Sequence, residues 1–168
     1  MPENNTAPLT VKCLKAVARN TVEITDRELD ALGPGMVRVK TELSMVSPGT
    51  ELHRIMDTHT VSRGFPTMTG YVAIGTVVGV GEGVDWPVLG ERVRYGPSHF
   101  EIIDIPAEGC TAVPEDIPSE TAVCTTLLTI SLRGARAGRV SLGDPVAVFG
   151  CPHCGEPGIP TIRRLVFA

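Results

Sequence analysis

The segment SMVSPGTELHR, residues 44–54, places a hydroxyl, a carboxylate and an imidazole close together, at Thr50, Glu51 and His53. A hydroxyl and an imidazole can pass a proton without a metal when their pKa values and hydrogen-bond geometry suit the transfer. Tyr71 adds a phenol that could donate a hydrogen bond to a substrate carbonyl. We therefore take Thr50, His53 and Tyr71 as the candidate catalytic residues.

Each candidate also has an ordinary structural interpretation. Thr50 can be a turn residue, His53 a surface histidine on a short helical segment, and Tyr71 a half-buried tyrosine. Glu51 can orient a nearby basic group, but we interpret it as a scaffold acid near a helix start, where the helix dipole favours negative charge. His99 precedes a predicted strand, and we interpret it as structural.

The pair Cys151 and Cys154 flanks His153 and has the spacing of half a zinc knuckle. A structural zinc site needs four ligands, and a redox dithiol should lie at the start of a helix. The sequence contains no second pair, and Pro157 and Pro160 break a helix at this point. We therefore assign the pair no metal or redox role. The five cysteines are scattered and odd in number, so they do not indicate a disulfide framework.

Composition limits the functional classes. The chain has 168 residues and is 42% hydrophobic, which predicts one folded domain, alone or with a fragment of a second. The net charge of −4 argues against binding to nucleic acid. No apolar stretch approaches the roughly 20 residues that span a bilayer, and the polar start MPENNTAPLTVK is not a signal peptide. We expect a cytoplasmic protein with no nucleic-acid or membrane partner.

The elements that must position these residues are mostly short strands. Runs rich in β-branched residues alternate with Gly and Pro turns, and no helical period appears before about residue 117. Ser119 is a suitable N-cap for a helix that continues to about residue 138, and a short apolar strand follows. This order predicts a mainly β (α+β) fold, a small barrel or sandwich with a C-terminal helix. The predicted strands lie in 11–29 (two strands around a turn at Arg19–Asn20), 36–43, 70–84, 89–96, 99–106 and 143–150.

Five segments in this order resemble motifs of the medium-chain dehydrogenase/reductase superfamily, which includes the zinc alcohol dehydrogenases. They are GTELH (49–53), GYVAIGTVVGVGEGV (70–84), LGERV (89–93), the stretch 98–122 and VSLGDPVAVFG (140–150). The resemblance covers about residues 10–150. It implies a flexible segment 1–9, a GroES-like, partly open β-barrel as the substrate domain at 10–121, and a linker helix with one orphan Rossmann-type strand at 122–150. Residues 151–168 form a tail unlike the family.

The family binds its nicotinamide cofactor in a Rossmann domain, which begins with a glycine-rich turn. Here Gly150, Gly155 and Gly158 have the spacing G-x4-G-x2-G, which differs from the fingerprint G-x-G-x-x-G. A Rossmann domain needs on the order of 100 residues for its βαβ units, far more than follow Gly158. We expect no cofactor in this chain. NAD(P) is expected only for a complete relative or for an assembly in which another chain supplies a Rossmann domain.

The resemblance also indicates that the family's catalytic zinc is missing. Pro48 stands where zinc members have a cysteine ligand, and Tyr71 and Val72 stand where they have a histidine and an acid. Cys124 lies near the position of a third ligand, and one ligand in place of three does not hold zinc. We expect no metal ligands. Thr50 and His53 match the positions that relay a proton from the substrate alcohol in zinc members, and the motifs are more similar to zinc-free branches of the family.

We therefore expect the substrate-domain portion of a zinc-independent oxidoreductase, inactive alone. In complete relatives, hydride passes between the nicotinamide and an alcohol or carbonyl. The alternative is a non-catalytic binding or interaction module, or a truncated remnant of such an enzyme. Residues 140–150 would form an unpaired apolar strand, and exposed edges of this kind recruit partners. We expect a homo-oligomer, or an assembly with a chain that supplies a Rossmann domain.

Overall fold

The computed structural model describes residues 9–58, 64–96, 99–141 and 143–146. The predicted mainly β fold is confirmed, since most of the elements are strands. The strands are β1 (Leu9–Ala18), β2 (Thr21–Leu29), β3 (Met36–Met45), β4 (Thr67–Met68), β5 (Val72–Val80), β6 (Arg92–Tyr95), β7 (Ile102–Pro106) and β8 (Thr111–Ala112). The helices are α1 (Pro48–Ile55), the 3-10 turn η1 (Ala107–Gly109), α2 (Ser119–Val123) and α3 (Thr125–Ala137).

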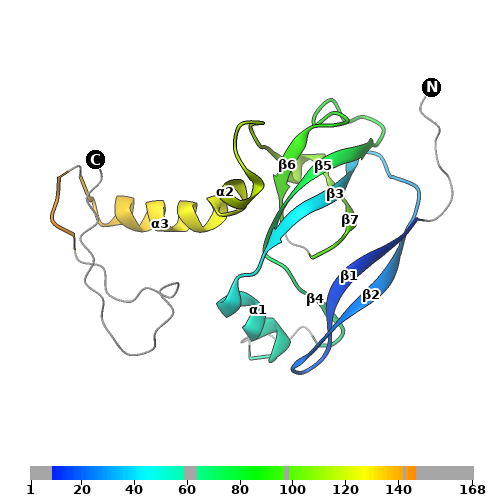
Figure 1. Ribbon diagram of the computed structural model, residues 1–168, viewed down its shortest axis with the longest axis horizontal. Coiled ribbons are helices and arrows are strands. Elements are labelled where there is room, and N and C mark those ends of the chain that lie inside the picture. The colour runs from blue at the N-terminus through cyan, green and yellow to red at the C-terminus, as the bar shows by residue number, and fades with distance from the viewer. Residues whose placement is uncertain (1–8, 59–63, 97–98, 142, 147–168) are drawn as a thin grey trace. The chain divides into compact units, whose positions relative to one another are not determined.

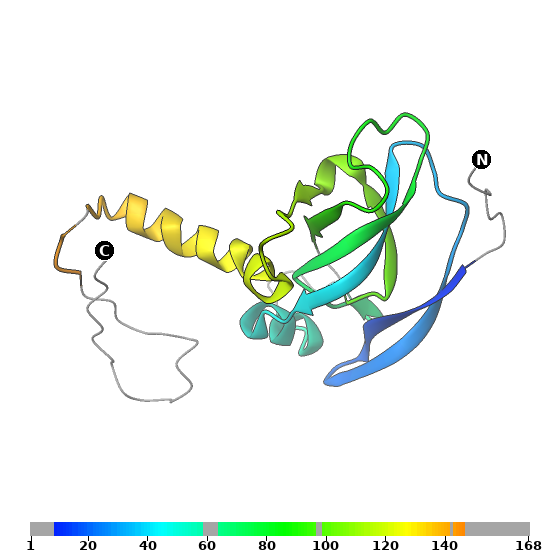
Figure 2. The same ribbon diagram turned by 45° about the horizontal axis from the view of Figure 1, so that its top comes forward.

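The strands form two antiparallel sheets rather than a closed barrel in the part of the chain described. One sheet has the order β2-β1-β4, and the other has the order β7-β3-β5-β6-β8. Figure 1 and Figure 2 show the long β1–β2 hairpin beside the sheet that holds β3 and β5. The segment 99–101 bridges the two sheets, because Cys13 of β1 pairs with Phe100 and the N–H of Thr41 in β3 donates to the carbonyl of Glu101 over 2.9 Å.

Helix α1 was not expected from hydrophobic periodicity, which indicated no helix before about residue 117. The helix has only eight residues and its buried residue is the charged Glu51, so it is too short for a hydrophobic periodicity to identify it. Pro48 occupies the first turn, where the missing N–H costs nothing and the fixed φ suits a helix. The turn predicted at Arg19–Asn20 is present, with Asn20 at φ 57°, and the N–H of Asn20 donates to the carbonyl of Ile55 at the end of α1.

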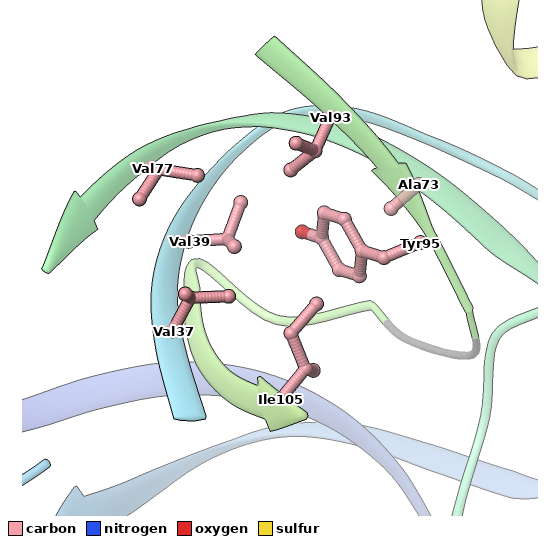
Figure 3. Packing of buried hydrophobic residues seen from close by; sticks show 7 residues of the cluster. All are labelled: Val37, Val39, Ala73, Val77, Val93, Tyr95 and Ile105. Carbon is pink, nitrogen blue, oxygen red and sulfur yellow. The ribbon is translucent and has the colours of Figure 1, made fainter. Parts of the chain in front are cut away.

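The core lies on both faces of β5, which explains why that segment is almost continuously apolar. One cluster, shown in Figure 3, surrounds the ring of Tyr95 and consists of Val37, Val39, Ala73, Val77, Val93, Tyr95 and Ile105. The other cluster lies against α2 and consists of Val72, Ile74, Val113, Ala122 and Val123. Alternate residues of β5 therefore serve different clusters, as the period of two of a strand requires.

Gly81, just after β5, has no room for a side chain. Its N–H donates to the carbonyl of Met36 over 2.8 Å, and a Cβ built on it would overlap the carbonyl oxygen of Gly33. The turn at 33–35, which the sequence predicted, is thereby held directly against the end of β5. Only glycine permits this approach of two backbones.

A polar cluster of Glu42, Arg92 and Ser119 holds α2 on the second sheet. Oε2 of Glu42 accepts the hydroxyl of Ser119 at 2.8 Å, and Nη1 of Arg92 donates to the carbonyls of Pro114 and Ile117, each over 3.1 Å. Burial by itself would raise the pKa of Glu42, but hydrogen bonds from Thr76 and Ser119 and the charge of Arg92 hold this pKa below its ordinary value. The carboxylate is therefore the stable form in the folded protein.

The predicted helix begins at Ser119 and is divided at Cys124 into α2 and α3. The prediction that Ser119 is its N-cap is wrong, because Pro118 occupies the N-cap position and the hydroxyl of Ser119 donates to Glu42 instead. The chain separates into two compact units between Thr126 and Leu127. Residues 143–146 have no strand conformation, and the rest of the predicted strand, 147–150, lies outside the described residues together with 1–8 and the tail 151–168. Within the described ranges, no helix is both long and apolar enough to cross a membrane.

Tyr95 predicts how stability responds to alkaline pH. Burial raises its pKa from the ordinary 10.0 to about 12, against the hydrogen bond with Thr41, whose Oγ1 lies 2.6 Å from the phenol oxygen. Above pH 10 the phenol ionises in the unfolded chain but stays neutral in the folded protein. Stability should therefore be complete below pH 10 and fall by on the order of 2–3 kcal/mol between pH 10 and 12. Urea unfolding at several pH values measures this loss.

The matched control is Tyr95→Phe, which keeps the ring and removes the titrating group. The variant should lose less stability over the same pH interval than the parent protein. Parallel pH profiles for the two proteins would contradict the assignment of the alkaline loss to Tyr95.

Candidate functional site

The centre of the candidate site is Glu51 of α1, which is only 3% exposed. Its Oε1 accepts the backbone N–H of Ser47 at 2.9 Å, and its Oε2 accepts the backbone N–H of Gly70 at 3.1 Å and faces Nε2 of His99 at 2.9 Å. Arg54, one turn further along α1, donates from Nη1 to the carbonyl of Gly70 over 3.0 Å. One short helix thus holds both backbone groups of Gly70, whose φ of 120° few residues other than glycine adopt.

His99 links this carboxylate to a serine. Its Nδ1 lies 2.8 Å from Oγ of Ser44 in β3, and its side chain is only 10% exposed. The backbone of His99 is fixed to β1, because the N–H of Leu14 donates to the carbonyl of His99 over 2.9 Å. The guanidinium of Arg27 lies over the neighbouring Phe100 ring at 5.5 Å from its centre. The result is a hydrogen-bonded chain of Ser44, His99 and Glu51.

The identities of the donors determine which nitrogen of His99 carries a proton. Backbone N–H groups can only donate, so both oxygens of Glu51 act as acceptors, and Nε2 of His99 donates the third hydrogen bond. In the neutral ring, Nδ1 is then the acceptor for the hydroxyl of Ser44. A buried carboxylate that orients an imidazole toward a hydroxyl is the arrangement used for proton transfer in many catalytic sites.

The outer end of this chain opens on a groove of about 350 Å³ between the β1–β2 hairpin and the second sheet. Ser44 and His99 line the groove, whereas Glu51 lies behind them. The other lining residues are Lys12, Cys13, Leu14, Ile24, Val46 and Glu101, so the wall is largely apolar.

The three residues proposed from the sequence lie on α1 and at the start of β5. Thr50 accepts a hydrogen bond from the hydroxyl of Ser47 at 3.2 Å, and Nδ1 of His53 lies 2.7 Å from the hydroxyl of Thr58 on the exposed side of α1. Tyr71 is half-buried and packs against the cluster beside α2. Thr50, His53 and Tyr71 therefore have different neighbours in the structure, and their catalytic roles stay a prediction.

The donor set at the family's metal position does not fit zinc. Pro48 offers no donor atom, and Val72 is buried in the core. The thiol of Cys124 donates to the carbonyl of Glu120 over 3.3 Å. Among the residues described, no three His, Cys, Asp or Glu side chains are grouped so that they could hold a metal ion. The pair Cys151 and Cys154 and the glycines after 147 lie outside the described residues.

Sequence reasoning did not find the chain of Ser44, His99 and Glu51. Ser44 was not considered, and Glu51 and His99 were interpreted as structural residues. His99 is 48 positions from Glu51 and 55 from Ser44, so no local spacing links them. The available signal was chemical, because an acidic side chain such as that of Glu51 can orient a nearby basic group.

No model of a known protein family matches this chain. A curated protein of Leishmania amazonensis named "Probable quinone oxidoreductase" is 31% identical over 149 residues, which cover 86% of this chain and 43% of that protein. The starvation-sensing protein RspB of Escherichia coli K12 is 25% identical over 81% of this chain and 48% of its own length. The chain thus spans about half the length of the curated relatives that it matches.

Solved structures show the same fold. A short chain alcohol dehydrogenase (rspB) from E. coli CFT073, crystallised with NADH, matches with a TM-score of 0.74 and 23% identity over 84% of this chain and 49% of that one. The 2R,3R-butanediol dehydrogenase of Bacillus subtilis matches with a TM-score of 0.74 and 21% identity, over 84% of this chain and 51% of its own.

Replacement of Glu51 should strongly destabilise the protein. Glu51→Ala would leave two buried N–H groups and an imidazole without their acceptor, so we expect a loss of about 3–5 kcal/mol in the free energy of unfolding. Urea unfolding followed by circular dichroism measures it. The control is Glu115→Ala, which removes an exposed carboxylate and should change stability by less than about 0.5 kcal/mol. Equal effects of the two substitutions would show that Glu51 does not hold the site together.

Proposed function

This chain belongs to the medium-chain dehydrogenase/reductase superfamily, and on that premise we propose that it forms the substrate-binding portion of a zinc-independent, nicotinamide-dependent oxidoreductase. The observation that carries the proposal is the match of its fold over 84% of the chain to a dehydrogenase crystallised with NADH. We propose independence from zinc because Pro48, Tyr71 and Val72, at the positions of the family's zinc ligands, do not supply a set of zinc donors.

The state of Glu51 supports independence from zinc. A carboxylate beside a metal site commonly orients a histidine that ligates the ion. Both oxygens of Glu51 instead accept backbone N–H groups, and Oε2 also faces His99, which is not a predicted ligand. The metal position itself is occupied by Pro48 and Tyr71. Polarisation of the substrate oxygen must therefore come from hydrogen-bond donors, for which Thr50, His53 and Tyr71 are the candidates from the sequence.

The proposed reaction is hydride transfer between a nicotinamide and an alcohol or carbonyl compound. The names of the relatives, a quinone oxidoreductase and a butanediol dehydrogenase, support this substrate class. The described residues form antiparallel sheets without a parallel sheet of the Rossmann type. NAD(P) would therefore be bound by a Rossmann domain in the working assembly. We propose a cytoplasmic location as part of the same function.

The exposed apolar side chains of α3 support a role of this helix in binding another chain. Leu128 and Leu132 are each 59% exposed and lie one turn apart on the same side of the helix. Apolar residues at this spacing are typical of a helix that packs against another surface. We propose that α3 and the following residues up to 150 pair with a second copy or with a chain that supplies a Rossmann domain. The same surface would also serve the alternative function, a non-catalytic interaction module.

The proposal predicts that this chain binds neither zinc nor nicotinamide by itself. We expect well under one zinc per chain after incubation with zinc and dialysis, measured by atomic emission, and no saturable NADH binding up to millimolar concentration, measured by nicotinamide fluorescence. The zinc measurement should use the Cys151→Ser/Cys154→Ser variant beside the parent, because this pair has the spacing of half a zinc knuckle and its thiols could bind zinc by themselves. One tightly held zinc in that variant, or micromolar binding of NADH, would contradict this prediction.

The proposed pairing predicts that the protein self-associates through α3. Purified protein at tens of micromolar should sediment as a dimer or larger species, and Leu128→Glu/Leu132→Glu should sediment as a monomer. The matched control is Ser131→Glu, which adds a charge to the same helix at an exposed position without removing apolar surface. A monomer of the parent protein in sedimentation velocity would sink the proposal that α3 joins two copies.

A further inference from the structure

We propose that a pocket at one end of the second sheet binds a small quaternary ammonium ion, against the indole of Trp86 and the carboxylates of Asp85 and Glu108. The pocket has no lining residue in common with the groove beside His99. The inference therefore goes beyond the proposed function and does not depend on it.

The register of the second sheet brings three chain segments together at this pocket. β3 begins where β5 and β7 end, because Val37 pairs with Val80 and Met36 pairs with Pro106. The turn before β3, the loop after β5 and the turn η1 after β7 therefore meet at one end of the sheet. The pocket between them has a volume of about 640 Å³, and its apolar wall includes Pro34, Met36, Val84 and Pro106.

Backbone hydrogen bonds fix these three segments to one another. The N–H of Gly35 donates to the carbonyl of Glu82 over 2.8 Å, and the N–H of Ala107 donates to the carbonyl of Gly35 over 3.0 Å. Pro87, the neighbour of Trp86, is fully buried and fixes the loop after β5 to the core. The protein itself thus holds the pocket in shape, so binding requires little further ordering of these segments.

The charged side chains of the pocket are both acidic. Asp85 and Glu108 are exposed, and neither carboxylate has a hydrogen-bond or ion-pair partner among the residues described. The lining includes no lysine, arginine or histidine. The pocket therefore attracts a cation and repels an anion.

Trp86 adds an aromatic surface to the same pocket. It is 41% exposed, so a ligand can reach the indole. A cation over an aromatic ring is attracted by the electrons of its face, and tryptophan gives the strongest contact of this kind. The side chains of Pro34, Met36 and Pro106 offer apolar surface to the alkyl groups of such a cation. Quaternary ammonium groups combine a positive charge with an apolar surface, and both features match this lining.

The lining does not fit a metal ion. Hard cations such as calcium take six to eight oxygen ligands, whereas the side chains of this pocket provide two carboxylates on a largely apolar wall. In the described ranges, no three His, Cys, Asp or Glu side chains are grouped so that they could hold a metal. A quaternary ammonium ion needs no coordinating set of this kind, because it is bound through its charge and its alkyl surface.

The test compares choline with 3,3-dimethylbutan-1-ol, an uncharged molecule of the same shape. Trp86 is the only tryptophan of the chain, so its fluorescence reports binding beside this residue. We expect choline to change the fluorescence saturably, with half-saturation at millimolar concentration. The alcohol should bind about tenfold more weakly, because it keeps the apolar contacts and loses the attraction to the indole and the carboxylates.

Two double variants separate the pocket from the net charge of the protein. Asp85→Asn/Glu108→Gln keeps the shape of both side chains and should weaken choline binding about tenfold, without changing the affinity for the alcohol. The matched control, Glu115→Gln/Asp116→Asn, removes two exposed carboxylates outside the pocket and changes the net charge equally. This control should bind choline as the parent protein does.

A third variant tests the indole. Trp86→Leu, checked for folding by circular dichroism, keeps an apolar side chain and removes the aromatic face. Saturation-transfer NMR on the methyl protons of choline measures binding without the fluorophore. We expect a several-fold weaker affinity for choline than in the parent protein measured in the same way.

Three results would overturn the inference. Without a saturable response to choline, Trp86 is an ordinary exposed side chain. Equal affinities for choline and the alcohol would indicate an apolar pocket that does not select a cation. Equal losses in the two double variants would indicate non-specific attraction by net charge. None of these results bears on the zinc and NADH predictions, because the pocket includes neither Pro48 nor Tyr71.

Discussion

The burial of one carboxylate governs the architecture around the site. Glu51 is charged in its ordinary state, and a buried charge is costly unless it is surrounded by donors. The donors come from three separate parts of the chain, namely Ser47 at the start of α1, Gly70 before β5, and His99 in the segment that bridges the sheets. The packing of α1, the conformation of Gly70 and the position of His99 therefore depend on one another.

The bridging segment 99–101 extends this dependence to the whole of the first unit. Its backbone pairs with β1 on one side and accepts hydrogen bonds from Thr41 of β3 on the other, so it joins two sheets that otherwise have separate hydrogen-bond ladders. Tyr95 and Thr41 add a buried contact at the same place, because Thr41 also donates to the carbonyl of Phe100. Groove, hydrogen-bonded chain and core thus share residues rather than occupying separate regions.

Local sequence patterns predicted strands β1, β2, β3, β5, β6 and β7, the turn at Asn20 and a helix that begins near Ser119, because each depends on residues within a few positions of one another. They did not predict the two-residue strands β4 and β8. Hydrophobic periodicity did not reveal α1, which has only eight residues and a glutamate at its buried position, although Glu51 was interpreted as an acid near a helix start. The contacts of His99 with Glu51 and Ser44 also escaped prediction, since they form only when β3, α1 and the bridging segment are folded together. The resemblance to a family identified the metal position, where Pro48 and Tyr71 stand, and it implied no functional role for His99.

His99 contributes in two ways to the structure described above, since its carbonyl accepts the N–H of Leu14 in β1 and its ring connects Ser44 to Glu51. Closure of the two sheets and assembly of the site are consequently one cooperative event. A partly unfolded protein in which the hairpin has detached would have no groove and no oriented imidazole. A molecule that binds only the intact groove therefore stabilises the folded state. Its affinity is linked to the free energy that holds the β1–β2 hairpin in place.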